Sequence, residues 1–261
     1  MMRYLKLLFG TVVISFLIVP LLAILPLAFT SGTFLNYPMQ GLSFRWFEQL
    51  WISDHWQRAI INTLVIGLAS SALATVLGVL ASLGLRRRRG VFYNLLQLVF
   101  LLPMVAPIVV LGVGMQILFA QLELTNTFAG VIIAHTVISL PFVLISVSSS
   151  LAAVDSRLER AAASLGASPV TVFRFVTLPL IRPGIQAGAI FAFATSLDEV
   201  VLVLFVGGTN QRTLAREMYA QLRDNVTPVI ASASFLFIVG TICLAALAVF
   251  LERRRAASTA A

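Results

Sequence analysis

Six long apolar stretches, separated by shorter polar segments, dominate the pattern of this chain. They run approximately over residues 7–29, 60–85, 91–119, 128–151, 184–206 and 229–251. A helix rises about 1.5 Å per residue, so roughly 20 apolar residues cross the hydrocarbon core of a bilayer. Each stretch is long enough, and the pattern predicts an all-α membrane protein with six transmembrane helices.

The composition agrees with this pattern. Only 11% of the residues are charged and 59% are hydrophobic, whereas soluble domains carry roughly 25% charged residues. Much of the surface must therefore face something other than water. We expect residues 1–261 to form a single transmembrane domain.

The basic residues predict the orientation of the spans. The net charge is +8. Basic residues gather in five places, which are Arg3, Lys6, the run 86–89, the loop 155–183 and the run 253–255. Because loops on the cytoplasmic side keep Lys and Arg, both termini are expected in the cytoplasm. The basic excess then orients the protein and attracts anionic membrane lipid, so no nucleic-acid partner is needed to explain it.

Several kinds of chemistry are excluded by residue type. Lys6 is the only lysine, so the chain lacks the lysine of a nucleotide-binding P-loop. Cys243 stands alone, and His55 and His135 are the only histidines. We therefore expect no metal site, no cofactor bound by this chain, and a packing role for His135.

Small residues within the second stretch predict close helix packing. Ser70, Ala74, Gly78 and Ser82 recur at every fourth position and so lie on one helix face. Prolines within the third and fourth stretches, at positions 103, 107 and 141, predict bends there.

The loop 155–183 is unusually long for a connection between spans and reads as two short helices. Asp155 is suited to cap the first helix, and Gly166 to end it in the left-handed conformation. Ser168 and Pro169 are suited to cap and begin the second. From the residues alone, two interpretations stay open: an amphipathic loop resting on the membrane, or a docking element for a soluble partner.

The spacing in this loop resembles a known motif. The loop contains the run Arg160, Ala161 and Ala162, followed by three residues and then Gly166. After nine more residues comes the segment 176–179, which reads Val-Thr-Leu-Pro. This resembles the EAA motif of binding-protein-dependent ABC importer permeases. The resemblance implies a type I permease fold, in which this loop is the coupling helix that enters a groove of a cytoplasmic ATPase.

Residue by residue, the motif assigns roles within the loop. Ala161, Ala162 and Gly166 would make the close contacts, and Leu178 and Pro179 would end the element. The departure is Arg160, which stands where the family usually has Glu. Glu159 is adjacent but points about 100° away on a helix, so the family's ion pair does not transfer directly.

The resemblance also implies partners. An ABC ATPase dimer would hydrolyse ATP with Mg, so this chain would be a transport subunit and not an enzyme. A second permease subunit, homologous or identical, would complete the pathway, and a periplasmic binding protein would deliver the substrate. The expected location is the cell inner membrane.

Two adjacent carboxylates, Asp198 and Glu199, lie within the fifth predicted span. A charged side chain at the centre of a membrane helix costs about 2.5 to 3.5 kcal/mol, which demands a reason. One reading is a cation pathway, to which Phe191 would add an aromatic wall and Thr195 a hydroxyl. The other reading places both acids near the outer boundary, solvated or paired with an arginine at 212 or 216.

A second resemblance concerns the substrate. The segments 192–201, 211–214 and 218–219 are similar to the spermidine/putrescine branch of these permeases. The resemblance implies polyamine import, because polyamines are multiply charged cations on an apolar stem. The alternatives are ABC import of another solute, such as an opine, thiamine or ferric ion, and an ion-coupled secondary carrier.

Overall fold

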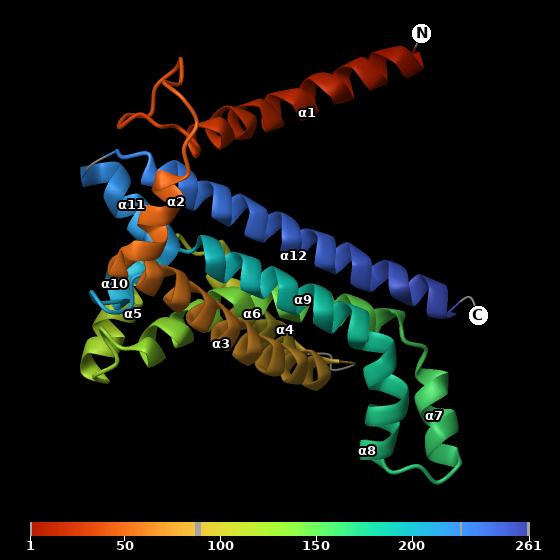
Figure 1. The fold of residues 1–261 in the computed structure, drawn as a ribbon. Coiled ribbons are helices and arrows are strands. Elements are labelled where there is room, and N and C mark those ends of the chain that lie inside the picture. Colours follow the sequence, from red (N-terminus) through yellow and green to blue (C-terminus); the bar gives the residue numbers. More distant parts are fainter. Residues whose placement is uncertain (1, 87–89, 225, 260–261) are drawn as a thin grey trace. The chain divides into compact units, whose positions relative to one another are not determined.

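The computed structural model describes residues 2–86, 90–224 and 226–259 (Figure 1). Arg87 to Arg89 of the predicted basic run lie outside the described residues, as do the side chains of Arg3 and of residues 253–255. The chain divides into two compact units. One comprises residues 1–57 and 217–242, and the other comprises residues 58–216 and 243–261.

Helices make up nearly all of the described chain. They are α1 (Met2–Leu27), α2 (Arg45–Ile52), α3 (Asp54–Leu85), α4 (Val91–Val105), α5 (Ile108–Gln121), α6 (Phe128–Ala153), α7 (Ser156–Ser164), α8 (Pro169–Val172), the π-helix η1 (Phe173–Thr177), α9 (Leu178–Asp198), α10 (Val201–Val206), α11 (Leu214–Asp224) and α12 (Val229–Thr259). The described residues contain no named strand, and a single antiparallel bridge joins Thr30 to Leu42. The all-α prediction is confirmed.

The candidate spans match the apolar stretches in number. In the described residues, five helical segments are long and apolar enough to cross a membrane. The pair α4 and α5 forms a sixth span if counted as one, and it is bent by 106°. The break follows Pro103 and includes Pro107, so the predicted bend of the third stretch is confirmed, whereas α6 runs through Pro141 without a break.

The fifth stretch differs from its predicted bounds. Its helix begins at Leu178, runs through Pro183 and ends at Asp198, and α10 follows as a separate short helix. The expectation that Leu178 and Pro179 end the preceding element is therefore wrong. In η1 the amide of Leu178 bonds to the carbonyl of Phe173, five residues earlier. This wider turn lets the helix continue past Pro179, which has no amide hydrogen to donate.

The closest packing in the larger unit is between α6 and α9. A Cβ at Gly184 would lie 2.6 Å from the carbonyl oxygen of Ser146, and one at Gly188 would lie 2.9 Å from Cα of Val143. Only glycine fits at such distances from a backbone. The two helices therefore pack almost backbone to backbone.

Helix α3 joins this pair through its small-residue stripe. A Cβ at Gly78 would meet the Val143 side chain at 2.7 Å, and the Ser82 hydroxyl donates to the carbonyl of Leu144 at 3.3 Å. Ser70 and Ala74 are fully buried. The predicted packing face of this helix is confirmed.

In the other unit, an aromatic cluster joins α2 to the first turns of α12 and to the segment after α1. The rings of Phe29, Phe47 and Phe235 lie within 5.7 Å of one another, centre to centre. Ser232 donates to the carbonyl of Ala28 at 2.9 Å. Apolar contact and a buried hydrogen bond thus hold this unit together.

Replacing Gly184 by alanine is expected to destabilise the protein by about 1 to 3 kcal/mol, because the added methyl group overpacks the contact with α6. The matched control is Gly114→Ala in α5, where a Cβ meets no atom within 4 Å. The thermal midpoint of the purified protein in detergent should fall for Gly184→Ala only. Equal midpoints for the two variants would contradict the close contact.

Candidate functional site

The segment of residues 155–177, named here the α7–α8 hairpin, has the predicted local structure. Asp155 caps α7 by accepting a hydrogen bond from the Arg157 amide at 2.8 Å, and Ser168 caps α8 by accepting one from Thr171 at 3.3 Å. Gly166 has a φ of +83°, which favours glycine. The predicted helix ends are therefore confirmed.

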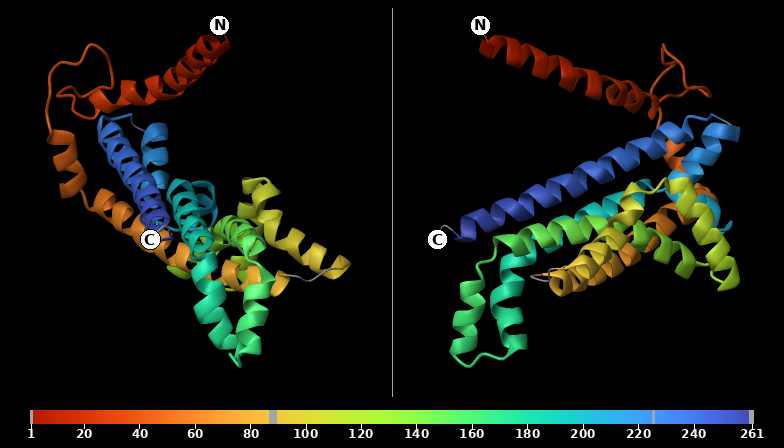
Figure 2. Two further views of the ribbon diagram at one scale, coloured as in Figure 1. Left: turned by 90° about the vertical axis from the view of Figure 1, so that its right-hand side faces the viewer. Right: turned by 180° about the vertical axis from the view of Figure 1, so that it is seen from behind.

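The hairpin projects from the ends of α6 and α9, and α7 and α8 lie side by side in each view (Figures 1 and 2). Large apolar side chains on it face outward. Leu165 is 89% exposed, Val170 73% and Phe175 69%. Such a concentration of exposed apolar surface is typical of a binding surface.

The motif residues lie on this projecting element with open surroundings. Ala161 is exposed, Ala162 is half-buried, and a Cβ at Gly166 would meet no atom within 4 Å. These residues have room for another chain. Leu178 and Pro179 instead lie in the first turn of α9.

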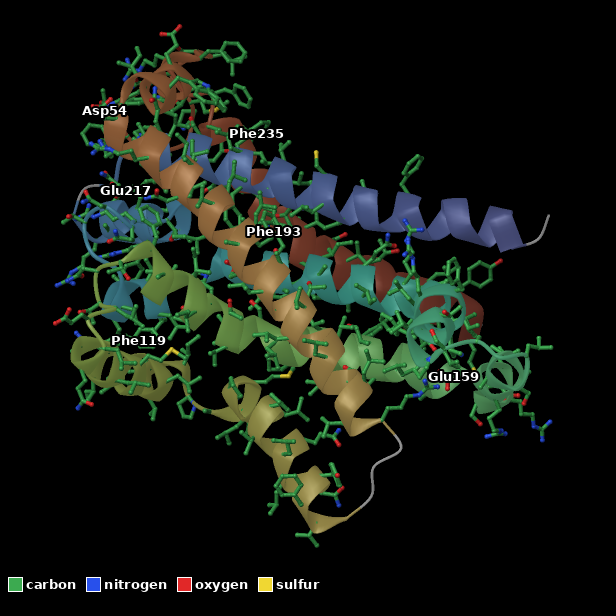
Figure 3. The ribbon with its side chains drawn as sticks, turned by 90° about the horizontal axis from the view of Figure 1, so that it is seen from below. Asp54, Phe119, Glu159, Phe193, Glu217 and Phe235 are labelled. Atoms are coloured by element: carbon green, nitrogen blue, oxygen red, sulfur yellow. The ribbon has the colours of Figure 1, made fainter. Side chains whose placement is uncertain are left out.

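Glu159 turns toward the rest of the larger unit (Figure 3). Its side chain is only 15% exposed and accepts hydrogen bonds from Arg86 Nη1 at 2.5 Å and from the Thr177 hydroxyl at 2.7 Å. Sequence reasoning missed Arg86 because it lies 73 positions away in the chain. Glu159, which precedes the position of the motif glutamate, therefore forms an ion pair within this chain.

Arg160 is exposed and makes a local contact. Its Nη1 donates to the Ser156 hydroxyl, one turn earlier in α7, at 2.9 Å. The residue that replaces the motif glutamate thus presents a positive charge on the open side of the hairpin.

Three of the four predicted pathway residues share one face of α9. Phe191 is 54% exposed, Asp198 is exposed, and Thr195 lies between them with its hydroxyl donating to the carbonyl of Phe191 at 2.9 Å. Spacings of four and three residues place them along one side of a helix. Asp198 makes no hydrogen bond or ion pair with the described part of the chain.

The fourth residue, Glu199, lies elsewhere. It is 7% exposed, and its carboxylate accepts a hydrogen bond from the Leu202 amide at 2.7 Å in the first turn of α10. Glu199 therefore caps α10, and the chain breaks between the two helices at this point. Arg216, one of the two arginines considered as a partner of these acids, donates through Nη1 to the carbonyls of Gly207 and Gly208.

A buried polar group lies directly behind this end of α9. His135 is fully buried, and its Nδ1 lies 2.7 Å from the Ser196 hydroxyl, which also accepts from the Ser70 hydroxyl at 3.2 Å. His135 is buried as predicted for a packing residue, and its partner Ser196 links α6 to α9 and, through Ser70, to α3. Its Nε2, however, has no hydrogen-bond partner among the described residues. Among the described residues, no three His, Cys, Asp or Glu side chains are grouped as a metal would require.

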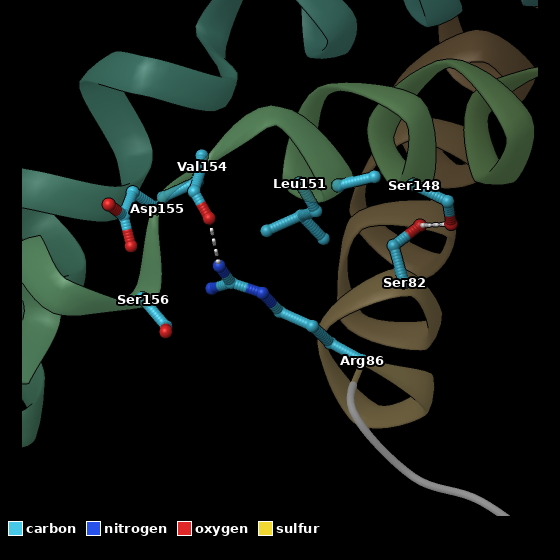
Figure 4. A pocket seen from close by; sticks show the side chains of 8 residues that line it. Ser82, Arg86, Ser148, Leu151, Val154, Asp155 and Ser156 are labelled. Atoms are coloured by element: carbon cyan, nitrogen blue, oxygen red, sulfur yellow. Dashed lines mark hydrogen bonds between the residues drawn. The ribbon is translucent and has the colours of Figure 1, made fainter.

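A cavity of about 500 Å³ opens beside Arg86, between the ends of α3 and α6 (Figure 4). Its lining includes Ser82, Ser148, Leu151 and Ser156. Arg86 Nη2 reaches the carbonyl of Val154 at 3.5 Å across one side of this space. The cavity lies next to Asp155 and Ser156, the first residues of the hairpin.

Three known permease proteins are similar to this sequence over most of its length. The spermidine/putrescine permease protein PotC of Haemophilus influenzae is 29% identical over 246 residues, covering 94% of this chain and 95% of its own. The putrescine permease protein PotI of Escherichia coli is 31% identical, covering 86% and 82%. The molybdenum permease protein ModB of Mycobacterium tuberculosis is 34% identical, covering 71% and 76%.

Solved structures share the fold. A chain of a bacterial ABC transporter that imports the acidic polysaccharide alginate superposes with a TM-score of 0.75 at 17% identity, covering 97% of this chain and 95% of that one. The same kind of transporter in complex with its alginate-loaded periplasmic protein gives 0.72.

Residues 74–257 match the family described as binding-protein-dependent transport system inner membrane component. The described helices supply the five to six membrane spans of such a subunit. The chain belongs to this family and is a multi-pass inner-membrane permease of an ABC importer.

Proposed function

We propose that this permease carries polyamines such as spermidine and putrescine. The observation that carries the proposal is the exposed face of α9, where Phe191, Thr195 and Asp198 lie in line. A carboxylate at one end and an aromatic ring at the other complement a cation on an apolar stem.

The end of α9 adds to this preference for a cation. Asp198 is the last residue of the helix, where the backbone carbonyls carry a partial negative charge. From Phe191 to Asp198 the helix rises about 10 Å, which lets one extended cation contact both. Discontinuous helices with irregular backbone between them are typical of substrate sites in transporters, and the break between α9 and α10 is one.

The relatives leave more than one cargo to distinguish. PotC and PotI favour polyamines, whereas ModB and the alginate transporter show that related permeases serve other solutes. An acidic cargo would be repelled by the exposed carboxylate of Asp198, so this residue favours the cationic one. An opine, thiamine or ferric ion as cargo would appear as uptake that polyamines do not inhibit. An ion-coupled carrier mechanism would appear as uptake that vanadate does not inhibit and that depends on an ion gradient.

The projecting hairpin, the exposed face of α9 and the relatives together suggest the partners. The α7–α8 hairpin, with its exposed apolar and basic surface, would dock on a cytoplasmic ABC ATPase dimer that hydrolyses ATP with Mg. A second permease would cover the exposed face of α9 and complete the pathway. A periplasmic binding protein would deliver the substrate, and the alginate transporter has been solved in complex with an alginate-bound periplasmic protein. Both termini then lie in the cytoplasm, and anionic lipid would contact the basic residues on that side.

Replacing Asp198 by asparagine is expected to lower uptake of labelled spermidine and putrescine by about tenfold, which corresponds to roughly 1.4 kcal/mol of lost cation binding. The matched control is Glu199→Gln. Its amide oxygen still accepts from Leu202, so we expect near-normal uptake and a lower thermal midpoint. Normal uptake by Asp198→Asn, with the complex assembled, would refute the cation face and leave family membership untouched.

Replacing Gly166 by valine is expected to reduce copurification of the ATPase several-fold. A residue with a Cβ is strained by about 1 to 2 kcal/mol in the left-handed backbone conformation of Gly166. The turn between α7 and α8 would therefore change direction. The control is Gly166→Asn, because asparagine tolerates this conformation. The bound ATPase would be identified by mass and by ATP hydrolysis. If both variants bind it as well as the parent protein does, the hairpin is not the docking element.

A further inference from the structure

Glu159 is the one acidic residue in the sequence of α7, and its side chain points away from the exposed side of the hairpin. It is 15% exposed, whereas Arg157 and Arg160 near it are exposed. A carboxylate withdrawn from water needs charged or hydrogen-bonding partners. Arg86 and Thr177 supply them at 2.5 and 2.7 Å.

The partners of this carboxylate come from different segments. Arg86 directly follows the last residue of α3, and Thr177 is the last residue of η1. Arg86 also reaches the carbonyl of Val154, the residue that ends α6. One carboxylate therefore ties α7 to the second arm of the hairpin and to the end of α3.

Helix α3 continues from this contact into the packed centre of the unit. Near its end Ser82 donates to the carbonyl of Leu144 in α6, and farther along Ser70 donates to Ser196 in α9. Because α3 is one continuous helix between these points, a displacement at Arg86 is passed along it.

We propose that Glu159, Arg86 and Thr177 form a latch that transmits movement of the α7–α8 hairpin to α3. The inference rests on the proposed function, because the movement is driven by a docked ATPase. Glu159 and Arg86 are positioning residues here, since neither is assigned to contact ATPase or substrate. The charge pair is the essential part, because a charge-assisted hydrogen bond between partly buried groups is stronger than a neutral one.

The test is an ATP-dependent change in the reactivity of a cysteine on α3. Gly84→Cys is suitable, because a Cβ there meets no atom within 4 Å, and the exposed native Cys243 is first replaced by alanine. The purified permease with its ATPase is labelled with a maleimide, with and without Mg-ATP and vanadate. In the parent protein the labelling rate should change with nucleotide. In Glu159→Gln the change should shrink by about fivefold, with the ATPase still bound.

Charge reversal separates the latch from simple loss of stability. Arg86→Glu and Glu159→Arg each place like charges together and should abolish the nucleotide-dependent change, whereas the double variant restores the pair and should recover it. Glu48→Gln, which neutralises an exposed acid on α2, is the control and should behave as the parent.

The outcomes distinguish this proposal from the one on which it rests. If no ATPase copurifies with the parent protein, the docking proposal is contradicted. If the ATPase binds but Glu159→Gln keeps the full nucleotide-dependent change, or the parent shows none, the latch alone is overturned. Should a single variant fail to accumulate, the charge-reversed pair decides, since an unrecovered change in that pair also overturns the latch.

Discussion

The near contact between the backbones of α6 and α9 is the constraint on which the rest of the structure depends. Gly184 and Gly188 allow this approach, and it buries one side of α9 along its length. The opposite side is left without cover from α6. As a result Ser196 points inward to His135, while Phe191 and Asp198 remain exposed. The candidate pathway is thus a consequence of helix packing.

The sequence predicted the features that depend on local chemistry. Hydrophobic length indicated the spans, and the caps at Asp155 and Ser168 and the turn at Gly166 followed from the preferences of single residues. The bend between α4 and α5 followed from the fixed geometry of proline. Each of these involves residues within a few positions of one another.

Features that depend on distant residues or on exact register were missed. The sequence did not show which of the two adjacent acids would be exposed. The chain leaves the helix at Glu199, so Glu199 caps α10 and Asp198 stays exposed. The partner of Glu159 was not visible because α4, α5 and α6 separate Arg86 from it in the chain. Leu178 and Pro179 were expected to end the element, and only the π-helical hydrogen bond shows how the helix continues past Pro179.

The length of the π-helix η1 also determines how α9 is turned about its own axis relative to α8. Each residue added to or removed from a helix turns everything beyond it by about 100°. The five residues of η1 connect α8 to α9, so their number fixes how α9 is turned about its axis relative to α8. Substitutions in η1 keep that number, whereas loss of a single residue would turn α9 by about 100° relative to α8. The length of this segment is therefore under stronger constraint than its composition.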